Sequence, residues 1–344
     1  MRGNQAAKLT IAIPTYNRNP MVLGLVRELL KQMTVETEVL ILDNGSEVPV
    51  QQTLEHGIEN LHEYPIHVER LDANVGQGLL RCMEMCRSPW MWGLTDKAVP
   101  RPDAIQTVLK TIGEHPDCIF LNFTPYLQQV EGGGKRRICD VETRGRKEML
   151  ENIIDYGATI DYMANVYHVP SYKKRYGSGC ATSLNCGYLH STSGAPQFAI
   201  VLHALGTEGK CYFSKEVIAE RPYTPPEMSW SHLNFMSSYM TPLIILEDAE
   251  ERNMLRKHIL GFIPTRKYFL VKFLLMATRD RSRAEFYYRL YRGFIVTYDK
   301  GFSTNMVILA SDILMKMPIL SVKLLDKTAR LFFKRSIRDA EERY

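Results

Sequence analysis

The 344-residue sequence lacks the features of disulfide-rich, membrane-spanning, secreted and repeat proteins. Its seven cysteines include no Cys-x-x-Cys pair, and an odd number without a regular framework fits reduced thiols in a cytoplasmic protein. No uninterrupted apolar run reaches the roughly 20 residues that a membrane-spanning helix needs. The polar segment 1–8 is unlike a signal peptide, and no internal repeat is evident. The sequence therefore predicts a cytoplasmic chain that can bury one large core and carry an appendage.

Acidic residues are scarce in the C-terminal part of the chain. Residues 251–344 carry 20 Lys and Arg against 9 Asp and Glu, a net charge of +11, whereas residues 1–250 carry 23 against 29. Aromatic residues at helical spacing, such as Tyr287 and Tyr291, predict amphipathic helices there. Two interpretations stay open. The helices form a bundle with basic side chains in water, or they lie on an anionic membrane surface.

Short apolar runs alternate with helical patterns through the N-terminal part. The runs have the length and composition of buried strands, and they occupy residues 9–13, 38–42, 66–71, 90–94 and 118–123. Strands that alternate with helices favour an α/β fold, with a mainly parallel sheet flanked by helices. Polar segments follow the first four runs. We expect these segments to meet along one edge of the sheet, where open α/β folds bind their ligands.

Four segments in this part carry a family resemblance. They are Leu9–Arg18, Leu40–Ser46, Asn74–Gly76 with Arg81 five positions later, and Trp92–Ile105. In this order and at this spacing they resemble the motifs of the family 2 glycosyltransferases, inverting enzymes of the GT-A fold. The resemblance is clear over residues 8–125, and weaker to about residue 220, where it is to bacterial polysaccharide enzymes. It implies a GT-A-like sheet followed by a C-terminal helical extension.

The resemblance also implies a binding site for a nucleotide-diphosphate sugar, with a UDP-sugar as one candidate donor. Asp43 would accept a hydrogen bond from the base edge, which suits a short carboxylate. Arg81 would approach the base or the diphosphate, since guanidinium pairs well with phosphate. Each motif taken alone is also an ordinary turn sequence. The residues that the resemblance assigns to the nucleotide are Pro14, Thr15, Tyr16, Arg18, Asp43, Asn74, Gly76 and Arg81.

The segment Thr95-Asp96-Lys97 departs from the family pattern. Family members carry two or three acidic residues after the fourth strand, one of which holds Mg²⁺ or Mn²⁺ on the diphosphate. Here Lys97 stands where a metal ligand is expected, and a charged ammonium cannot bind a metal. Three interpretations stay open. Lys97 replaces the metal as the cation on the leaving diphosphate; Asp96 alone still binds the metal, helped by water and phosphate; or the site is catalytically degenerate.

The general base of an inverting transfer is less evident. Residues 176–205 resemble the acceptor-side segment of some bacterial polysaccharide enzymes, yet the segment contains no acidic residue. His190 is its candidate base, because histidine titrates near neutral pH. A histidine with a purely structural role is the competing interpretation. Asp155 and Asp161 are the nearest upstream carboxylates, and they fit a helix face and a helix cap equally well.

Together these features predict a glycosyltransferase, inverting as the resemblance implies. It would have two parts, a GT-A-like nucleotide-sugar-binding and catalytic domain over residues 1–226 and a basic helical region over 227–344. Its acceptor would be a glycan or a lipid-linked sugar, and the enzyme would work in the cytoplasm, peripheral to the inner face of the membrane. The catalytic candidates are Asp96, Lys97 and His190, with Asp96 as the metal ligand. The alternative is a catalytically degenerate binding or scaffold protein at a membrane surface. Nucleic-acid binding ranks last, because no nucleic-acid-binding module is recognised.

Overall fold

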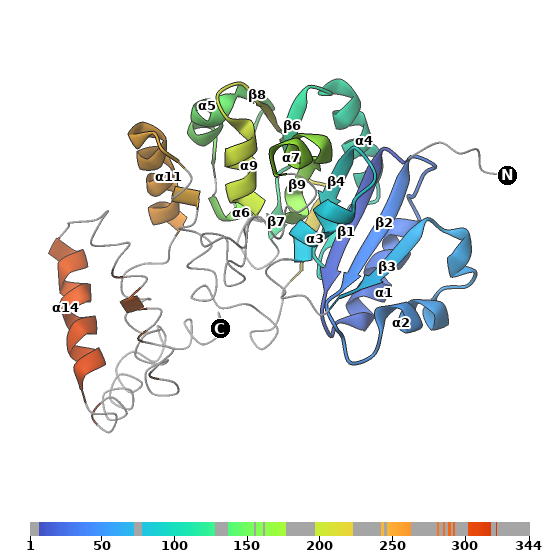
Figure 1. Ribbon diagram of the computed structural model, residues 1–344, viewed down its shortest axis with the longest axis horizontal. Coiled ribbons are helices and arrows are strands. Elements are labelled where there is room, and N and C mark those ends of the chain that lie inside the picture. Colours follow the sequence, from blue (N-terminus) through green and yellow to red (C-terminus); the bar gives the residue numbers. More distant parts are fainter. Residues whose placement is uncertain are drawn as a thin grey trace. The chain divides into compact units, whose positions relative to one another are not determined.

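The computed structural model describes most of the N-terminal part of the chain and, in the C-terminal part, mainly residues 251–262 and 302–317 (Figure 1). The described residues are 7–71, 78–127, 137–154, 156–160, 162–176, 197–222, 242–243, 246–262, 281, 285, 288–289, 292, 302–317 and 321. The chain divides into two compact units. The first comprises Met1–Tyr223 and Thr241–His258, and the second comprises Thr224–Met240 and Ile259–Tyr344. The division into a catalytic domain and a basic region after residue 226 remains a prediction.

An eight-stranded sheet forms the centre of the first unit, with the strand order β3-β2-β1-β4-β9-β6-β10-β8. The pairs β1–β2, β2–β3, β1–β4 and β6–β10 are parallel, whereas β9 runs antiparallel to both its neighbours and β8 runs antiparallel to β10. The expected mainly parallel α/β sheet is therefore confirmed. The strands are β1 (Leu9–Thr15), β2 (Thr37–Asp43), β3 (Ile66–Arg70), β4 (Trp90–Gly93), β6 (Cys118–Asn122), β8 (Val141–Arg144), β9 (Asn165–His168) and β10 (Lys210–Phe213).

The central strands are buried almost without interruption, as expected for parallel strands that are covered on both faces. Every residue of β1 except Pro14 is buried, and all of β4 is buried. Trp92 of β4 is fully buried, and its indole N–H donates to the backbone carbonyl of Met163 over 2.9 Å. This bond satisfies the one polar atom of a large core side chain, so the tryptophan can fill the core without a desolvation penalty.

The helices of the first unit connect and cover these strands. Helix α1 buries one apolar face, formed by Val22, Leu25, Val26 and Leu29, at the spacing of an amphipathic helix. The helical elements are α1 (Asn19–Leu30), α2 (Val50–Gly57), η1 (Leu61–Glu63), α3 (Gly78–Met85), α4 (Ala104–Glu114), α5 (Gly145–Glu151), α6 (Tyr156–Ile160), η4 (Tyr162–Ala164), α7 (Val169–Tyr176) and α9 (Gln197–Leu205). Helix α11 (Ala249–Phe262) begins in this unit, where its Glu251 forms an ion pair with Arg146 of α5 at 3.1 Å.

A second, three-stranded sheet joins segments that are far apart in the sequence. Strand β11 (Ala219–Arg221) lies between β5 (Val99–Pro100), to which it is antiparallel, and β7 (Tyr126–Leu127), to which it is parallel. Because β5 comes directly after the Thr95-Asp96-Lys97 segment, this small sheet brings the end of β11 close to that segment. The sequence did not predict this arrangement.

The second unit is described mainly through α14 (Phe302–Lys316). One side of this helix is buried at Ile308, Ser311 and Leu314. The phenolic O–H of Tyr288 donates to Asp312 over 2.7 Å and holds the helix to a neighbouring segment of the same unit. Among the described residues, no helix is both long and apolar enough to cross a bilayer.

Candidate active site

The candidate site lies at the carboxyl ends of three neighbouring parallel strands, β2, β1 and β4. Thr15 at the end of β1 lies opposite Asp43 at the end of β2, and the amide of Leu94, which follows β4, donates to the carbonyl of Ala12 over 2.9 Å. The polar segments after these strands therefore emerge at the same edge of the sheet. That edge is where open α/β folds bind their ligands, as the sequence predicted.

Asp96 is buried at this edge and is already in contact with the segment that follows β1. Its Oδ2 accepts a hydrogen bond from the Thr15 hydroxyl over 2.9 Å. The Arg18 guanidinium lies 3.1 Å from Oδ1 and 3.4 Å from Oδ2. The structure thus brings together three of the residues that the resemblance assigned to the site. In this arrangement the carboxylate is neutralised by Arg18, which is what a buried charge requires.

Lys97 lies beside Asp96, and its side chain is half-buried. The pKa of Lys97 is lowered to about 8, first because burial disfavours its charged form, and then because the positive charges of Arg18 and Arg221 repel it. The negative charge of Asp96 offsets only part of this effect. Arg221 is the last residue of β11, and the three-stranded sheet brings it near Lys97. The sequence did not indicate this residue, because it belongs to no local motif.

These four side chains suit an anion better than a divalent cation. Three of them are cations, and the one carboxylate already accepts hydrogen bonds from a hydroxyl and a guanidinium. Mg²⁺ prefers several oxygen ligands, and a neighbouring ammonium repels it. Within the part of the chain that the structure describes, the residues around Asp96 therefore fit Mg²⁺ or Mn²⁺ poorly, and they fit a diphosphate well.

Asp43 shapes the second polar segment of this edge. Its carboxylate accepts hydrogen bonds from the amides of Ser46 at 2.8 Å and Val50 at 3.2 Å, which is the first residue of α2. Arg70 at the end of β3 donates to the same carboxylate over 3.2 Å. Asp43 is buried, so these bonds fix the turn and the start of the helix. A carboxylate has about four acceptor positions, and the predicted hydrogen bond to a base would use the one that remains.

Side chains from the first two polar segments also bind each other. Asn17 adopts a left-handed backbone conformation, with φ of 52°, which asparagine tolerates better than most residues. Its amide donates to the Ser46 hydroxyl over 2.9 Å, and its side-chain oxygen accepts from the amide of Glu47 over 2.8 Å. Next to it, Tyr16 is 48% exposed. Tyr16 is therefore available to a ligand at this edge.

Helix α3 begins close against the ends of β1 and β2. A Cβ atom on Gly78, the first residue of α3, would lie 2.8 Å from the Cβ of Pro14 and 3.3 Å from the side-chain nitrogen of Asn44. Only glycine allows this approach. Asn44 is buried, and neither its side-chain oxygen nor its nitrogen has a hydrogen-bond partner among the described residues. The edge thus contains a polar side chain with unused hydrogen-bonding capacity.

The other residues predicted for the site either make a different contact or lie outside the described residues. Arg81 lies on α3 and binds Glu84 of the same helix at 3.0 Å. Asn74, Gly76 and His190 lie outside the described residues, as do the two alternative carboxylates Asp155 and Asp161. The roles predicted for all of these residues stay predictions.

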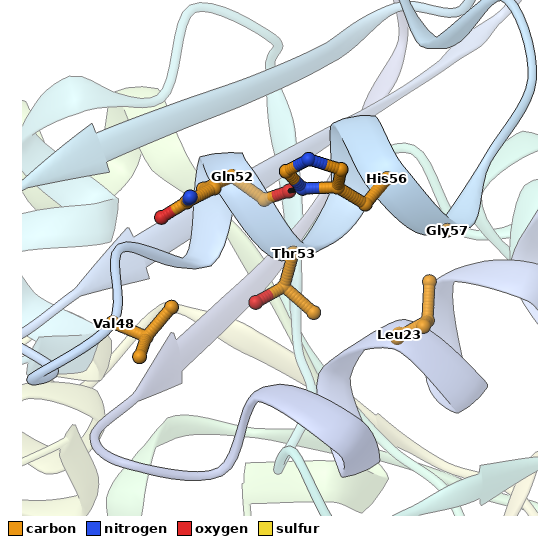
Figure 2. Close-up of a pocket in the computed structure, with 6 residues that line it drawn as sticks. All are labelled: Leu23, Val48, Gln52, Thr53, His56 and Gly57. Atoms are coloured by element: carbon orange, nitrogen blue, oxygen red, sulfur yellow. Dashed lines mark hydrogen bonds between the residues drawn. The ribbon is translucent and has the colours of Figure 1, made fainter.

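A shallow hollow lies elsewhere on the first unit, between α1 and α2 (Figure 2). It has a volume of about 430 Å³ and is lined by Leu23, Val48, Gln52, Thr53, His56 and Gly57. None of the residues predicted for the nucleotide lines it. The hollow is mostly apolar and open to solvent, so it is not the candidate site.

Comparison with known proteins agrees with this geometry. Residues 10–165 match the model of glycosyl transferase family 2. This segment belongs to that family. It includes the β1, β2 and β4 strand ends and the Asp96–Lys97 pair. An uncharacterized glycosyltransferase of Haemophilus influenzae is 27% identical to the chain over 127 residues, which are 36% of this chain and 41% of that relative. The alignment therefore spans less than half of the relative's length.

Solved structures share the fold of this chain. The S. aureus TarS fragment 1–349 in complex with UDP aligns with 97% of this chain and 90% of its own, at 14% identity and a TM-score of 0.59. The same fragment in complex with UDP-GlcNAc aligns over the same shares of the two chains, with a TM-score of 0.58. At this level of identity the likeness establishes the fold. The expected GT-A-like α/β architecture is confirmed.

Proposed function

We propose that this protein is a glycosyltransferase that takes a sugar from a nucleotide-diphosphate donor, with UDP-sugars as the first candidates. The observation that carries the proposal is the cluster of Arg18, Lys97 and Arg221 around Asp96 at the carboxyl edge of a family 2 sheet. The TarS structures of the same fold, in complex with UDP and UDP-GlcNAc, support this choice of donor.

The three cations of the cluster would stabilise the negative charge of a diphosphate leaving group. In the transfer, the bond between the anomeric carbon and the diphosphate oxygen breaks, and negative charge builds on that oxygen. A cation held near it stabilises the transition state, and the effect is strongest where water is excluded. Lys97 is half-buried and close to two guanidinium groups, so it is suited to this task. We propose that Lys97 takes the part that a divalent ion has in family members with more carboxylates.

Asp96 would organise this cluster. Its ion pair with Arg18 fixes the guanidinium beside Lys97, and its hydrogen bond to Thr15 fixes the carboxylate itself. A bound diphosphate would compete with Asp96 for Arg18, because bidentate pairing with phosphate is equally favourable for a guanidinium. The acceptor hydroxyl must lose its proton to a base, for which His190 remains our candidate. A base on the face opposite the leaving group would give inversion.

The proposal is tested by calorimetric titration of UDP in the presence of EDTA, and again with Mn²⁺. Wild-type protein should bind UDP in both conditions. Lys97→Gln and Arg221→Gln should each weaken binding in EDTA by about tenfold, the effect of one charge-assisted contact. Lys110→Gln, which changes an exposed lysine on α4, is the matched control and should bind normally. If wild-type protein binds UDP in neither condition, the donor site is wrong; if only Mn²⁺ allows binding, the role of Lys97 is wrong.

The alternative function is a binding or scaffold protein that no longer catalyses transfer. It is favoured by the same departure from the family pattern, a lysine at a metal-ligand position. Release of UDP from UDP-GlcNAc and related UDP-sugars, with and without glycan and lipid-linked acceptors, distinguishes the two. Turnover that Lys97→Gln abolishes supports the enzyme. UDP binding without turnover of any donor supports the scaffold.

We also propose that the C-terminal part binds an anionic membrane surface, where a lipid-linked acceptor would be found. The C-terminal part carries a net charge of +11, and one face of α14 exposes Met306, Leu309 and Ile313 at helical spacing. An exposed apolar stripe in a basic region fits the interface of an anionic bilayer. The full chain should sediment with anionic vesicles and not with zwitterionic ones. Replacing the three residues by Gln should release it, whereas Val35→Gln, an exposed residue of the first unit, should not.

A further inference from the structure

The turn between α4 and β6 presents a histidine and a cysteine together. It lies at the amino end of β6, whereas Asp96 follows the carboxyl end of β4. Helix α4 ends at Glu114 and β6 begins at Cys118, and the amide of Cys118 donates to the carbonyl of His115 over 3.1 Å. The two side chains are thus separated by two residues of a hydrogen-bonded turn. Ligand pairs with two intervening residues are common in zinc sites, because one turn then holds both ligands in place.

Glu142 of strand β8, which is separated from β6 by β10, completes the cluster. Its Oε2 lies 3.0 Å from the Nδ1 of His115. One ligand atom each from His115, Cys118 and Glu142 lies within 4.8 Å of the other two. In a tetrahedral zinc site with bonds of about 2.0–2.3 Å, ligand atoms are about 3.3–3.8 Å apart. The three atoms are therefore within about 1 Å of that spacing, and 43% of the Glu142 side chain is exposed.

Two further residues hold these side chains in position. Lys210 of β10 lies 3.5 Å from the Oε1 of Glu142, so it contacts the carboxylate oxygen that His115 leaves free. The ring of Tyr212 stacks on the imidazole of His115, with 3.7 Å between the ring centroids. Partners that orient a ligating carboxylate and a ligating imidazole are a regular part of protein metal sites. Asp117 lies 3.8 Å from the Lys210 ammonium and balances its charge.

We propose that His115, Cys118 and Glu142 form a zinc site that is separate from the nucleotide site. A neutral imidazole, a thiolate and a carboxylate give a net charge of zero with Zn²⁺, which a partly buried position favours. The thiol proton passes to solvent on binding, and water takes the fourth position. A mixed set of nitrogen, sulfur and oxygen ligands suits Zn²⁺ rather than Mg²⁺, which prefers oxygen. Bound zinc would join the α4–β6 turn to the edge strand β8.

The experiment uses Co²⁺ and Zn²⁺ on the full chain after treatment with EDTA. One equivalent of Co²⁺ should bind and give a thiolate-to-cobalt absorption band, and Zn²⁺ should displace it and raise the melting temperature. Cys118→Ser should abolish the band, whereas Cys139→Ser, which changes an exposed cysteine, should keep it. His115→Gln and Glu142→Gln change partly exposed side chains, and each should weaken Zn²⁺ binding by about tenfold or more.

Asp96→Asn separates this site from any metal at the nucleotide site. Because Asp96 follows β4 at the other edge of the sheet, the Asp96→Asn protein should keep the cobalt band and the zinc-induced rise in melting temperature. The proposal is overturned if wild-type protein shows no band, or if the band survives Cys118→Ser. It is also overturned if Cys118→Ser fails to fold while His115→Gln and Glu142→Gln both bind Zn²⁺ as the wild type does.

Discussion

Raising the pH from 7 to 9 is expected to weaken UDP binding in EDTA about fivefold. The reason is the position of Lys97, whose pKa is lowered to about 8 by burial and by the charges of Arg18 and Arg221. About nine-tenths of the lysines are charged at pH 7 and about one-tenth at pH 9. If the charged form binds the diphosphate, the bound nucleotide raises the pKa of Lys97. The dissociation constant then rises as the free protein loses this proton.

The assay is titration calorimetry at constant ionic strength, because screening by salt would otherwise change with the buffer. The phosphate groups of UDP are almost fully ionised at pH 7, so the charge of the ligand changes little between pH 7 and 9. Lys97→Arg keeps its charge over this range, so its affinity should not change with pH. Lys97→Met should bind weakly at pH 7 and lose nothing further by pH 9.

A flat profile for the wild type would refute the reasoning, since a charged Lys97 would then not contribute to binding. A profile that persists unchanged in Lys97→Met would refute it too, because another group would be titrating.

Three further predictions concern stability. Asp43→Ala should lower the free energy of unfolding by about 2–4 kcal/mol in chemical denaturation, because it removes a buried acceptor of two amides and an arginine. Gly78→Ala should lower it by about 1–3 kcal/mol, because the new Cβ meets Pro14 at 2.8 Å, whereas Gly24→Ala has nothing within 4 Å and should raise it by about 0.5–1 kcal/mol. An unchanged Gly78→Ala protein would contradict the close packing. Lys97→Met should raise stability by about 1–2 kcal/mol below pH 8, since the folded chain disfavours the charged lysine, and thermal unfolding should show this gain fading towards pH 10.5.

The sequence predicted the first half of the sheet closely. The five expected strands correspond to β1, β2, β3, β4 and β6, because short buried runs between polar turns have few alternatives. The antiparallel strands β8 and β9 were not predicted. β9 lies between β4 and β6 although residues 165–168 come after both, and no local pattern specifies such an insertion. Its place depends on pairing with partners far along the chain.

The candidate site shows the same division. Pro14, Thr15 and Asp43 stand at strand ends because local patterns of apolar and turn residues fix where β1 and β2 stop. The sequence marked Lys97 as unusual but could not show its partners. Whether it faces a metal, a carboxylate or other cations depends on Arg18 and Arg221, which reach it only through the folded sheet.

The sequence by itself thus determined where the strands end, which family motifs are present and that Lys97 departs from them. Each of these features depends only on residues that are close together in the sequence. Only the tertiary structure decided what surrounds Asp96. A hydroxyl at the end of β1 and a guanidinium from the segment after it bind its carboxylate, and β11 places a third cation near Lys97. The same holds for His115, Cys118 and Glu142, which the pairing of β6 and β8 with the strand between them, β10, brings together. Charges act through space, so their sum at a site follows from the fold and not from the order of residues along the chain.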